Sequence, residues 1–257
     1  MIIAIYIFVI FLATTLGAVA GLGGGVIIKP ILDLIGYHDA STIVFISSWA
    51  VLSMAIYSTI KQAYSGIKID WIITSTVAIG AILGGYIGNI IFDYLLLMID
   101  STLVNIVQAL LLNSLLIFVL FNINNKNSLC IQNKIIFVII GFLLGVTSSF
   151  LGIGGGPINV AVFTFFFSMD LKKATIYSIA TILFSQSSKL ITIAMTVGFE
   201  KYDCSILLYI IPTAIVGGIV GSYFNKKLNN HNIAKIFKIS VMFIIFINIL
   251  ILFKNIF

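Results

Sequence analysis

Charged residues are scarce in this sequence. They make up 9 % of its 257 residues, whereas a soluble domain carries roughly 25 %. Hydrophobic residues make up 61 %, and the mean hydropathy is +1.21. A soluble domain of this composition could not cover its own surface with polar groups, so the composition excludes a soluble globular protein. It indicates a chain that lipid surrounds.

Arginine is absent, and all fourteen cationic side chains are lysines. The net charge of +6 therefore does not point to nucleic acid, because arginine supplies the bidentate contacts that nucleic acids favour. Cytoplasmic loops of membrane proteins carry such an excess of positive charge. Cys130 and Cys204 form no disulfide framework, and no cluster has metal-site spacing. We expect no nucleic-acid partner, no metal and no cofactor.

Long uncharged runs take the place of these features. A helix that crosses a membrane needs about 20 mainly apolar residues. Six uncharged runs have that length: 1–28, 40–60, 71–92, 101–125, 135–169 and 204–225. The first run has no basic residues before it, so it predicts a retained span rather than a cleaved signal peptide. We predict an all-α membrane bundle of eight to ten segments.

Glycine motifs recur in the same order along the chain. Three pairs match: 21–25 (GLGGG) with 152–156 (GIGGG), 65–70 (SGIKID) with 197–203 (VGFEKYD), and 84–88 (GGYIG) with 217–221 (GGIVG). Glycine is common in membrane helices, so one match would mean little, but three in order indicate a duplication. We predict two membrane repeats, 1–125 and 134–257, joined by a linker at 126–133.

The placement of lysines predicts how the repeats are oriented. Each repeat has a short segment after its glycine triplet, at 26–36 or 157–168. If that segment does not cross, the repeats are parallel and the loop lysines divide six against six. Alternatively, the segment crosses, or it pairs with its predecessor, which shifts the rest of the repeat to the other side of the membrane. Ten lysines then share one side, and only Lys201 and Lys254 oppose them. Positive loops gather in the cytoplasm, so we predict inverted repeats with both termini outside.

Each repeat contains three consecutive glycines, which favour a break in the helix. They are Gly23, Gly24 and Gly25, and Gly154, Gly155 and Gly156. An unpaired backbone group in lipid is costly, so such a break must be buried or line a polar cavity. The helix that restarts there presents N-terminal amides, which bind anions. Close helix packing is the alternative, but transporters place substrate at broken helices between repeats.

Several uncharged polar residues lie inside the predicted spans. Ser47 and Ser48 follow the first broken helix, and Thr181 and Ser185 occupy the counterpart segment. We take them as candidate donors to a substrate, although a hydroxyl in a membrane helix most often bonds the carbonyl four residues earlier. Asn159 lies beside the second triplet, where its amide either faces the substrate or packs.

Lys189 is predicted near the middle of the membrane. An ionisable residue at that depth is costly and marks a functional site; snorkelling to the interface is the alternative. Its partner is expected to be a bound anion, because the acidic residues lie in loops or near segment ends, apart from Asp33. Lys29 is a weaker candidate, since Asp33 one turn later can neutralise it.

Three stretches resemble the TauE/SafE family of sulfite and organosulfonate permeases: 17–30 (GAVAGLGGGVIIKP), its second copy 145–159 (GVTSSFLGIGGGPIN), and 170–175 (DLKKAT). The likeness covers nearly the whole chain. It implies a permease for small sulfur-containing or carboxylate anions that needs no bound cofactor. The family's Thr-Ser pair after the first loop of each half is only partly kept, at 40–44 and 174–178.

We therefore expect a secondary transporter in a bacterial plasma membrane that binds a small anion between the broken helices. A proton or sodium ion is the expected partner if transport is coupled. An anion channel or a non-transporting membrane scaffold is the alternative. An enzyme is not expected, because no paired acid and base, phosphate loop or nucleophile elbow is found.

Overall fold

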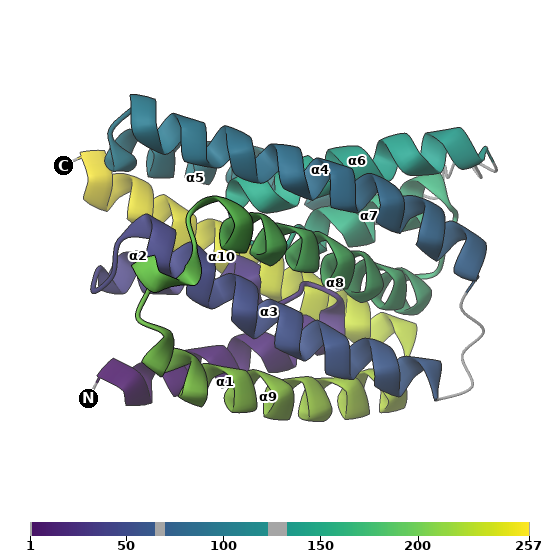
Figure 1. The fold of residues 1–257 in the computed structure, drawn as a ribbon. Helices are drawn as coiled ribbons and strands as arrows, with labels where there is room; N and C mark the ends of the chain where they lie inside the picture. The colour runs from purple at the N-terminus through teal and green to yellow at the C-terminus, as the bar shows by residue number, and fades with distance from the viewer. Residues whose placement is uncertain (1, 65–69, 123–132, 257) are drawn as a thin grey trace.

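The computed structural model describes residues 2–64, 70–122 and 133–256. Within these ranges the chain is helical and contains no strand, which confirms the all-α prediction. The long helices lie lengthwise beside one another (Figure 1). The ten α-helices are α1 (Ile2–Ala20), α2 (Gly25–Ile35), α3 (Ala40–Ala63), α4 (Trp71–Met98), α5 (Ser101–Asn122), α6 (Lys134–Leu151), α7 (Gly156–Phe166), α8 (Leu171–Thr196), α9 (Leu207–Lys227) and α10 (Asn230–Ile256).

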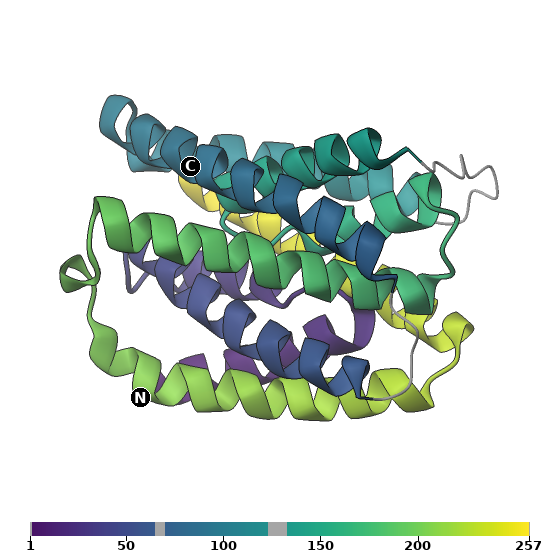
Figure 2. The ribbon, with the colours of Figure 1, turned by 45° about the vertical axis from the view of Figure 1, so that its right-hand side comes forward.

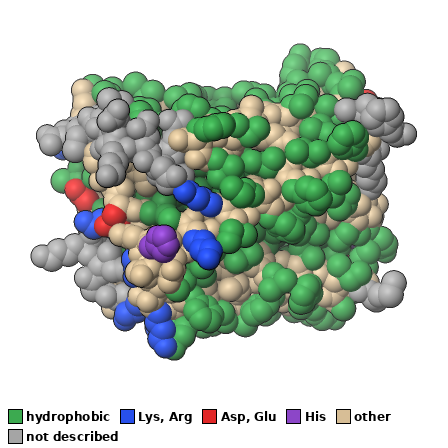
Figure 3. All heavy atoms as spheres, turned by 180° about the vertical axis from the view of Figure 1, so that it is seen from behind, with side chains coloured by type: hydrophobic (Ala, Val, Ile, Leu, Met, Phe, Trp, Pro, Cys, Tyr) green, Lys and Arg blue, Asp and Glu red, His purple; other side chains and the backbone are tan. Residues whose placement is uncertain are grey.

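Eight of the described helices, all except α2 and α7, are long and apolar enough to cross a membrane. Large apolar side chains such as Phe8, Phe121 and Met195 point outward from them. Figure 3 shows the face opposite to the one seen in Figure 1. Hydrophobic side chains cover most of this face, and lysines gather toward one end of it. The chain is therefore a multi-pass membrane protein.

The two short helices fold back on their predecessors. Tyr6 near the start of α1 contacts His38 just after α2, with its hydroxyl 2.8 Å from Nδ1. In the second half, the rings of Phe137 near the start of α6 and Phe167 after α7 lie 4.8 Å apart. The α1–α2 and α6–α7 pairs are therefore hairpins that return the chain to the end where it entered. Pairing with the predecessor, one of the two paths left open by the sequence, is the path taken.

The helices of the two halves pack reciprocally. Helix α4 packs along α6 as α9 packs along α1, and α3 packs on α9 as α8 packs on α4 (Figures 1 and 2). The recurring GGxxG motifs make two of these contacts, because Gly84 lies against the Phe142 carbonyl and Gly221 against the Thr15 carbonyl. This exchange of partners supports the predicted duplication. The predicted linker at 126–133 lies outside the described residues except for Asn133.

The ends of the bundle carry different residues. Lys61, Lys226 and Lys227 line one cavity, as the inverted arrangement requires, because there only Lys201 and Lys254 oppose the other loop lysines. The described starts of α1 and ends of α10 lie toward the other end (Figures 1 and 2). There the Ser41 Oγ and the Tyr202 hydroxyl lie 3.0 Å apart. These contacts agree with inverted repeats, which stay a prediction, as does the assignment of the lysine-rich end to the cytoplasm.

Candidate functional site

The two helix breaks meet inside the bundle. Gly156 lies directly against the Leu22 carbonyl, and Gly25 lies against the Ile153 carbonyl. Ser178 of α8 bridges them, because its hydroxyl donates to the Gly21 carbonyl at 2.7 Å and lies 3.3 Å from the Gly156 carbonyl. The structure thus brings both glycine triplets to one place, where helices of the two halves touch.

The glycines of the triplets are needed for the backbone conformation of the breaks. Gly23 and Gly24 have φ +78°, Gly154 has +80° and Gly155 has +66°. Residues with a Cβ rarely adopt this left-handed region, whereas glycine adopts it without steric cost. The six triplet residues are also buried. The predicted breaks are therefore present, and lipid does not reach their backbone.

The surroundings of the two breaks differ in polarity. A side chain on Gly23 would meet Ile182, and one on Gly24 would meet Ala13 of the same hairpin. In the second break, Gly155 lies beside Ser148 and the Asn159 Oδ1. The first triplet is therefore enclosed by apolar side chains and its own helix, whereas the second has polar neighbours.

Lys189 lies next to the second break and does not snorkel. It is fully buried, at 0 % exposure, and its ammonium donates to the Ser149 carbonyl at 3.0 Å. Its Nζ also lies 5.7 Å from the centre of the Phe92 ring. Ser149 belongs to the last turn of α6, where carbonyl groups carry partial negative charge. The end of the broken helix therefore holds this cation in place.

Asp93 follows directly after Phe92, whose ring lies beside the Lys189 ammonium. The sequence placed Asp93 near a segment end, but α4 continues to Met98, so Asp93 lies within the helix. Its carboxylate accepts a hydrogen bond from Asn89 at 2.9 Å. No described carboxylate forms an ion pair with Lys189. Asp93 is therefore a neighbouring acidic residue, but it is not an ion-pair partner of Lys189 in the described chain.

Two more polar groups at the second break lack partners within the described protein. They are the Ser149 hydroxyl and the Asn159 Oδ1, both buried. A third group, the Gln186 amide, lies 3.4 Å from the Ser148 hydroxyl. A buried polar group without a partner costs about 1–3 kcal/mol, so these groups are suited to meet a ligand. We call Ser148, Ser149, Asn159, Gln186 and Lys189 the second-break cluster.

Most of the predicted hydroxyl donors bond their own helices instead. Ser48 donates to the Val44 carbonyl at 2.8 Å, and Thr181 donates to that of Tyr177 at 2.9 Å. Ser185 donates to the Ile182 carbonyl at 3.2 Å. Ser47 is the exception among the four, because its buried hydroxyl has no partner among the described groups.

Ser148 and Ser149 were not among the residues predicted from the sequence. A comparison of the repeats contains a signal for them, because these positions correspond to Gly17 and Ala18 at the 131-residue shift between the triplets. The second repeat therefore carries hydroxyls where the first has none.

A basic cavity of about 490 Å³ opens between α3 and α9 at the lysine-rich end. We call it the basic vestibule; its lining includes Lys61, Gln62, Ser222, Asn225, Lys226 and Lys227. Its Asn225 donates to the Val19 carbonyl at 2.6 Å and to the Thr175 hydroxyl at 3.2 Å. Val19 lies in the last turn of α1. The wall of the vestibule is therefore hydrogen-bonded to the end of α1, which precedes the first break.

Comparison with known proteins agrees with this architecture. The model of the family described as "Sulfite exporter TauE/SafE" matches residues 6–249, which is nearly the whole chain. No curated protein and no solved structure gives a significant match. The chain therefore belongs to the sulfite exporter TauE/SafE family.

Proposed function

We propose that this protein is a secondary transporter that carries a small oxyanion, such as sulfite, an organosulfonate or a carboxylate, and binds it at the second-break cluster. Membership of a family of sulfite exporters supports membrane transport of a sulfur-containing anion. The choice of site rests on the residues of this chain.

The observation that carries the proposal is the fully buried Lys189 without an ionic partner among the described residues. A buried ammonium is costly unless it is paired, and its bond to the Ser149 carbonyl uses only one of its three N–H groups. An oxyanion would supply both the missing charge and the missing acceptors. Lys189 is therefore the principal anion-binding group in this proposal.

The neighbouring groups complement a ligand with several oxygen atoms. The Ser149 hydroxyl has no described partner. It can donate to an anion bound at Lys189, whose ammonium bonds the carbonyl of the same serine. The side-chain amide of Asn159 presents a donor if its oxygen and nitrogen exchange places, since that assignment follows from the hydrogen-bond network. The first turn of α7 begins at Gly156 and adds backbone amides at a positively polarised helix end.

The basic vestibule supplies a route from one end. Three lysines line it, and a cleft lined by charges of one sign raises the local concentration of the opposite ion. The second-break cluster itself is buried apart from a small exposed fraction. This closure favours a carrier, which exposes its site to one side at a time, over an open channel.

Anion flux in proteoliposomes tests this proposal. Purified protein is reconstituted, and entry of labelled sulfite, sulfate, methanesulfonate and acetate is measured with and without the same anion inside. We expect saturable entry of at least one sulfur-containing anion, accelerated by unlabelled anion on the other side. Flux that rises linearly with concentration would instead identify a channel, and absence of flux for every anion would contradict transport.

A further inference from the structure

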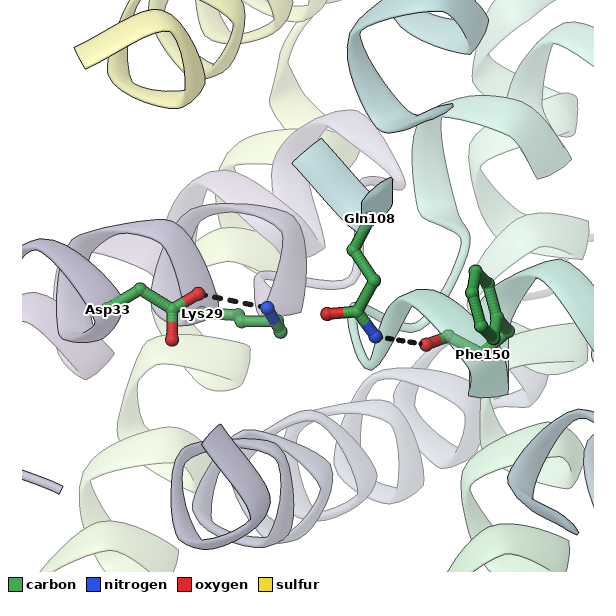
Figure 4. A network of polar contacts seen from close by, with 4 residues as sticks. All are labelled: Lys29, Asp33, Gln108 and Phe150. Atoms are coloured by element: carbon green, nitrogen blue, oxygen red, sulfur yellow. Dashed lines mark hydrogen bonds and ion pairs between the residues drawn. The ribbon is translucent and has the colours of Figure 1, made fainter. Parts of the chain in front are cut away.

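The basic vestibule carries positive charge that the described chain does not balance. None of the described residues that line it is acidic, and neither Lys226 nor Lys227 forms an ion pair with a described carboxylate. The buried Lys29 of α2 differs, because its Nζ lies 2.9 Å from the Asp33 Oδ2 (Figure 4). Charge is therefore balanced inside the bundle at α2, whereas the vestibule is suited to a ligand of opposite charge.

One glutamine in the wall of the vestibule lacks partners. Gln62 lines the cavity and is only 5 % exposed. Both polar atoms of its side chain, Nε2 and Oε1, have no hydrogen-bond partner among the described groups. A buried amide without partners is costly. Gln62 therefore offers a donor and an acceptor to a ligand in the vestibule.

The negative end of α9 is covered at this place. The Lys172 ammonium of α8 donates to the Lys226 carbonyl at 3.0 Å and to the Leu228 carbonyl at 2.9 Å. Carbonyl groups in the last turn of a helix carry partial negative charge, which repels an anion. Because Lys172 neutralises these carbonyls, the end of α9 does not oppose an anion beside it.

Helices α3 and α9 run side by side in the same direction toward the vestibule (Figures 1 and 2). A Cβ on Gly218 would lie 3.2 Å from the Met54 carbonyl oxygen. Four residues further along both helices, the Ser58 and Ser222 hydroxyls lie 3.0 Å apart. The next turn of each helix reaches the vestibule, which therefore lies at the end of the α3–α9 seam.

An apolar stripe on α9 leads to the same place. Ile219, Tyr223 and Lys227 follow at intervals of four residues, so they lie on one face of the helix. Ile219 is 41 % exposed and Tyr223 is 54 % exposed, and the Lys227 Nζ lies 4.4 Å from the centre of the Tyr223 ring. Exposed tyrosines gather at the level of the lipid head groups. The stripe therefore faces acyl chains, and the lysine at its end faces head groups.

We propose that the basic vestibule binds the phosphate group of an anionic phospholipid, with an acyl chain along Ile219 and Tyr223. Lysine is a common phosphate ligand, and basic pockets between membrane helices bind anionic head groups. Lys226 and Lys227 supply the charge, and the Gln62 amide donates to a phosphate oxygen. The volume of about 490 Å³ lies in the range of about 300–1,000 Å³ for sites that hold drug-sized ligands, which exceeds what a sulfite-sized anion fills.

The apolar stripe favours a phospholipid over free phosphate, because only the lipid has a chain to cover it. The site is separate from the second-break cluster, so lipid binding does not depend on anion transport. A bound phosphate neutralises the lysines that attract transported anions. Steering of those anions by the vestibule is therefore measured in vesicles of phosphatidylcholine, where no anionic lipid competes.

Binding of radiolabelled phosphatidylglycerol to the detergent-purified full-length protein tests this proposal. Phosphatidylcholine is the competitor, because it carries the same phosphate but its choline group cancels the charge. We expect saturable binding that excess phosphatidylcholine does not displace and that high salt weakens. Lys226→Gln with Lys227→Gln should weaken it about 30-fold, since each lysine near an anionic lipid contributes about a fivefold gain.

Two further variants separate the vestibule from net charge and from the head group alone. Lys235→Gln with Lys238→Gln removes the same charge from α10, outside the cavity lining, and should keep the wild-type affinity. Ile219→Ser changes only the exposed stripe and should weaken lipid binding several-fold. Inorganic phosphate in large excess should not displace the lipid, because it lacks the acyl chain. Thermal unfolding confirms that each variant is folded.

Several results would overturn the lipid site. They are equal affinity for the two lipids, equal losses in the two lysine pairs, and wild-type affinity in Lys226→Gln with Lys227→Gln. Displacement by inorganic phosphate at the concentration of the lipid, together with wild-type affinity in Ile219→Ser, would identify a site for free phosphate instead. Each of these results would leave the proposed anion site at the second-break cluster standing, because that site uses none of these residues.

Discussion

Gly156 of the second triplet lies directly against the carbonyl group of Leu22, beside the first triplet. The ends of two broken helices from different halves of the chain thus touch through their backbones. Side chains cannot be added at this contact without moving one break away from the other. The proposed anion site is adjacent to this contact, so its geometry depends on both halves.

The first prediction concerns this contact. Gly156→Ala should lower the free energy of unfolding by about 3 kcal/mol, the upper range for overpacking a core, because its Cβ would overlap the Leu22 backbone. Gly85→Ala is the control, because a Cβ on this glycine of α4 would lie 3.2 Å or more from its neighbours, so the loss should be about 1 kcal/mol or less. Thermal unfolding of the detergent-purified variants measures both. Equal losses would show that the contact of the breaks is not tight.

The second prediction concerns the sides of the membrane. In a background with Cys130 and Cys204 replaced by serine, single cysteines at the exposed Asn229, Asp39 and Asp203 report the side. Impermeant thiol reagents should label Asn229→Cys only from the cytoplasm, and the two aspartate positions only from outside, because the lysines gather at the Asn229 end. Labelling of all three from the same side would refute the inverted arrangement.

The third prediction concerns the basic vestibule. Lys226→Gln with Lys227→Gln should slow anion entry from that end several-fold at low ionic strength, and high salt should abolish the difference, because screening weakens steering. Lys235→Gln with Lys238→Gln removes the same charge from α10, outside the cavity lining. Initial rates in proteoliposomes compare the pairs. Equal slowing by both would mean that net charge matters and the vestibule does not.

The fourth prediction concerns the loop that follows α8. The Tyr202 ring stacks on Phe45 at 4.2 Å with 9° between the planes, and burial raises the pKa of Tyr202. Tyr202→Phe should cost about 1 kcal/mol of stability because only the hydrogen bond to Ser41 is lost. Tyr202→Ala should cost about 3 kcal/mol because the stack is lost as well. If both variants unfold at the wild-type temperature, this loop does not contribute to the fold.

Much of the fold could be predicted from local sequence features. Uncharged runs predict spans because a helix needs about 20 mainly apolar residues to cross lipid. The glycine triplets predict breaks because residues with a Cβ rarely adopt the left-handed backbone seen at Gly24 and Gly155. The structure also resolved the path of the short segments, which the sequence left open. Hairpin closure depends on contacts such as Tyr6 with His38, between residues far apart in the chain.

The candidate site was less predictable. Ser48, Thr181 and Ser185 were chosen as inward donors, but their hydroxyls bond carbonyls of their own helices. Ser148 and Ser149 were missed, because their importance comes from packing between α6 and α8 rather than from a local pattern. Lys189 was predicted from its depth alone, and burial without snorkelling agrees with that reasoning.

The most direct test of the account is the affinity for sulfite of the wild type, Lys189→Met and Lys201→Met. Lys201 is an exposed lysine, so its variant controls for loss of one positive charge. Thermal unfolding confirms that each protein is folded before binding is measured. The account predicts that Lys189→Met weakens binding about 100-fold, as expected when a buried charge loses its partner, that Lys189→Arg retains part of the affinity, and that Lys201→Met binds as the wild type does. Wild-type affinity in a folded Lys189→Met protein would contradict an anion site at the second break.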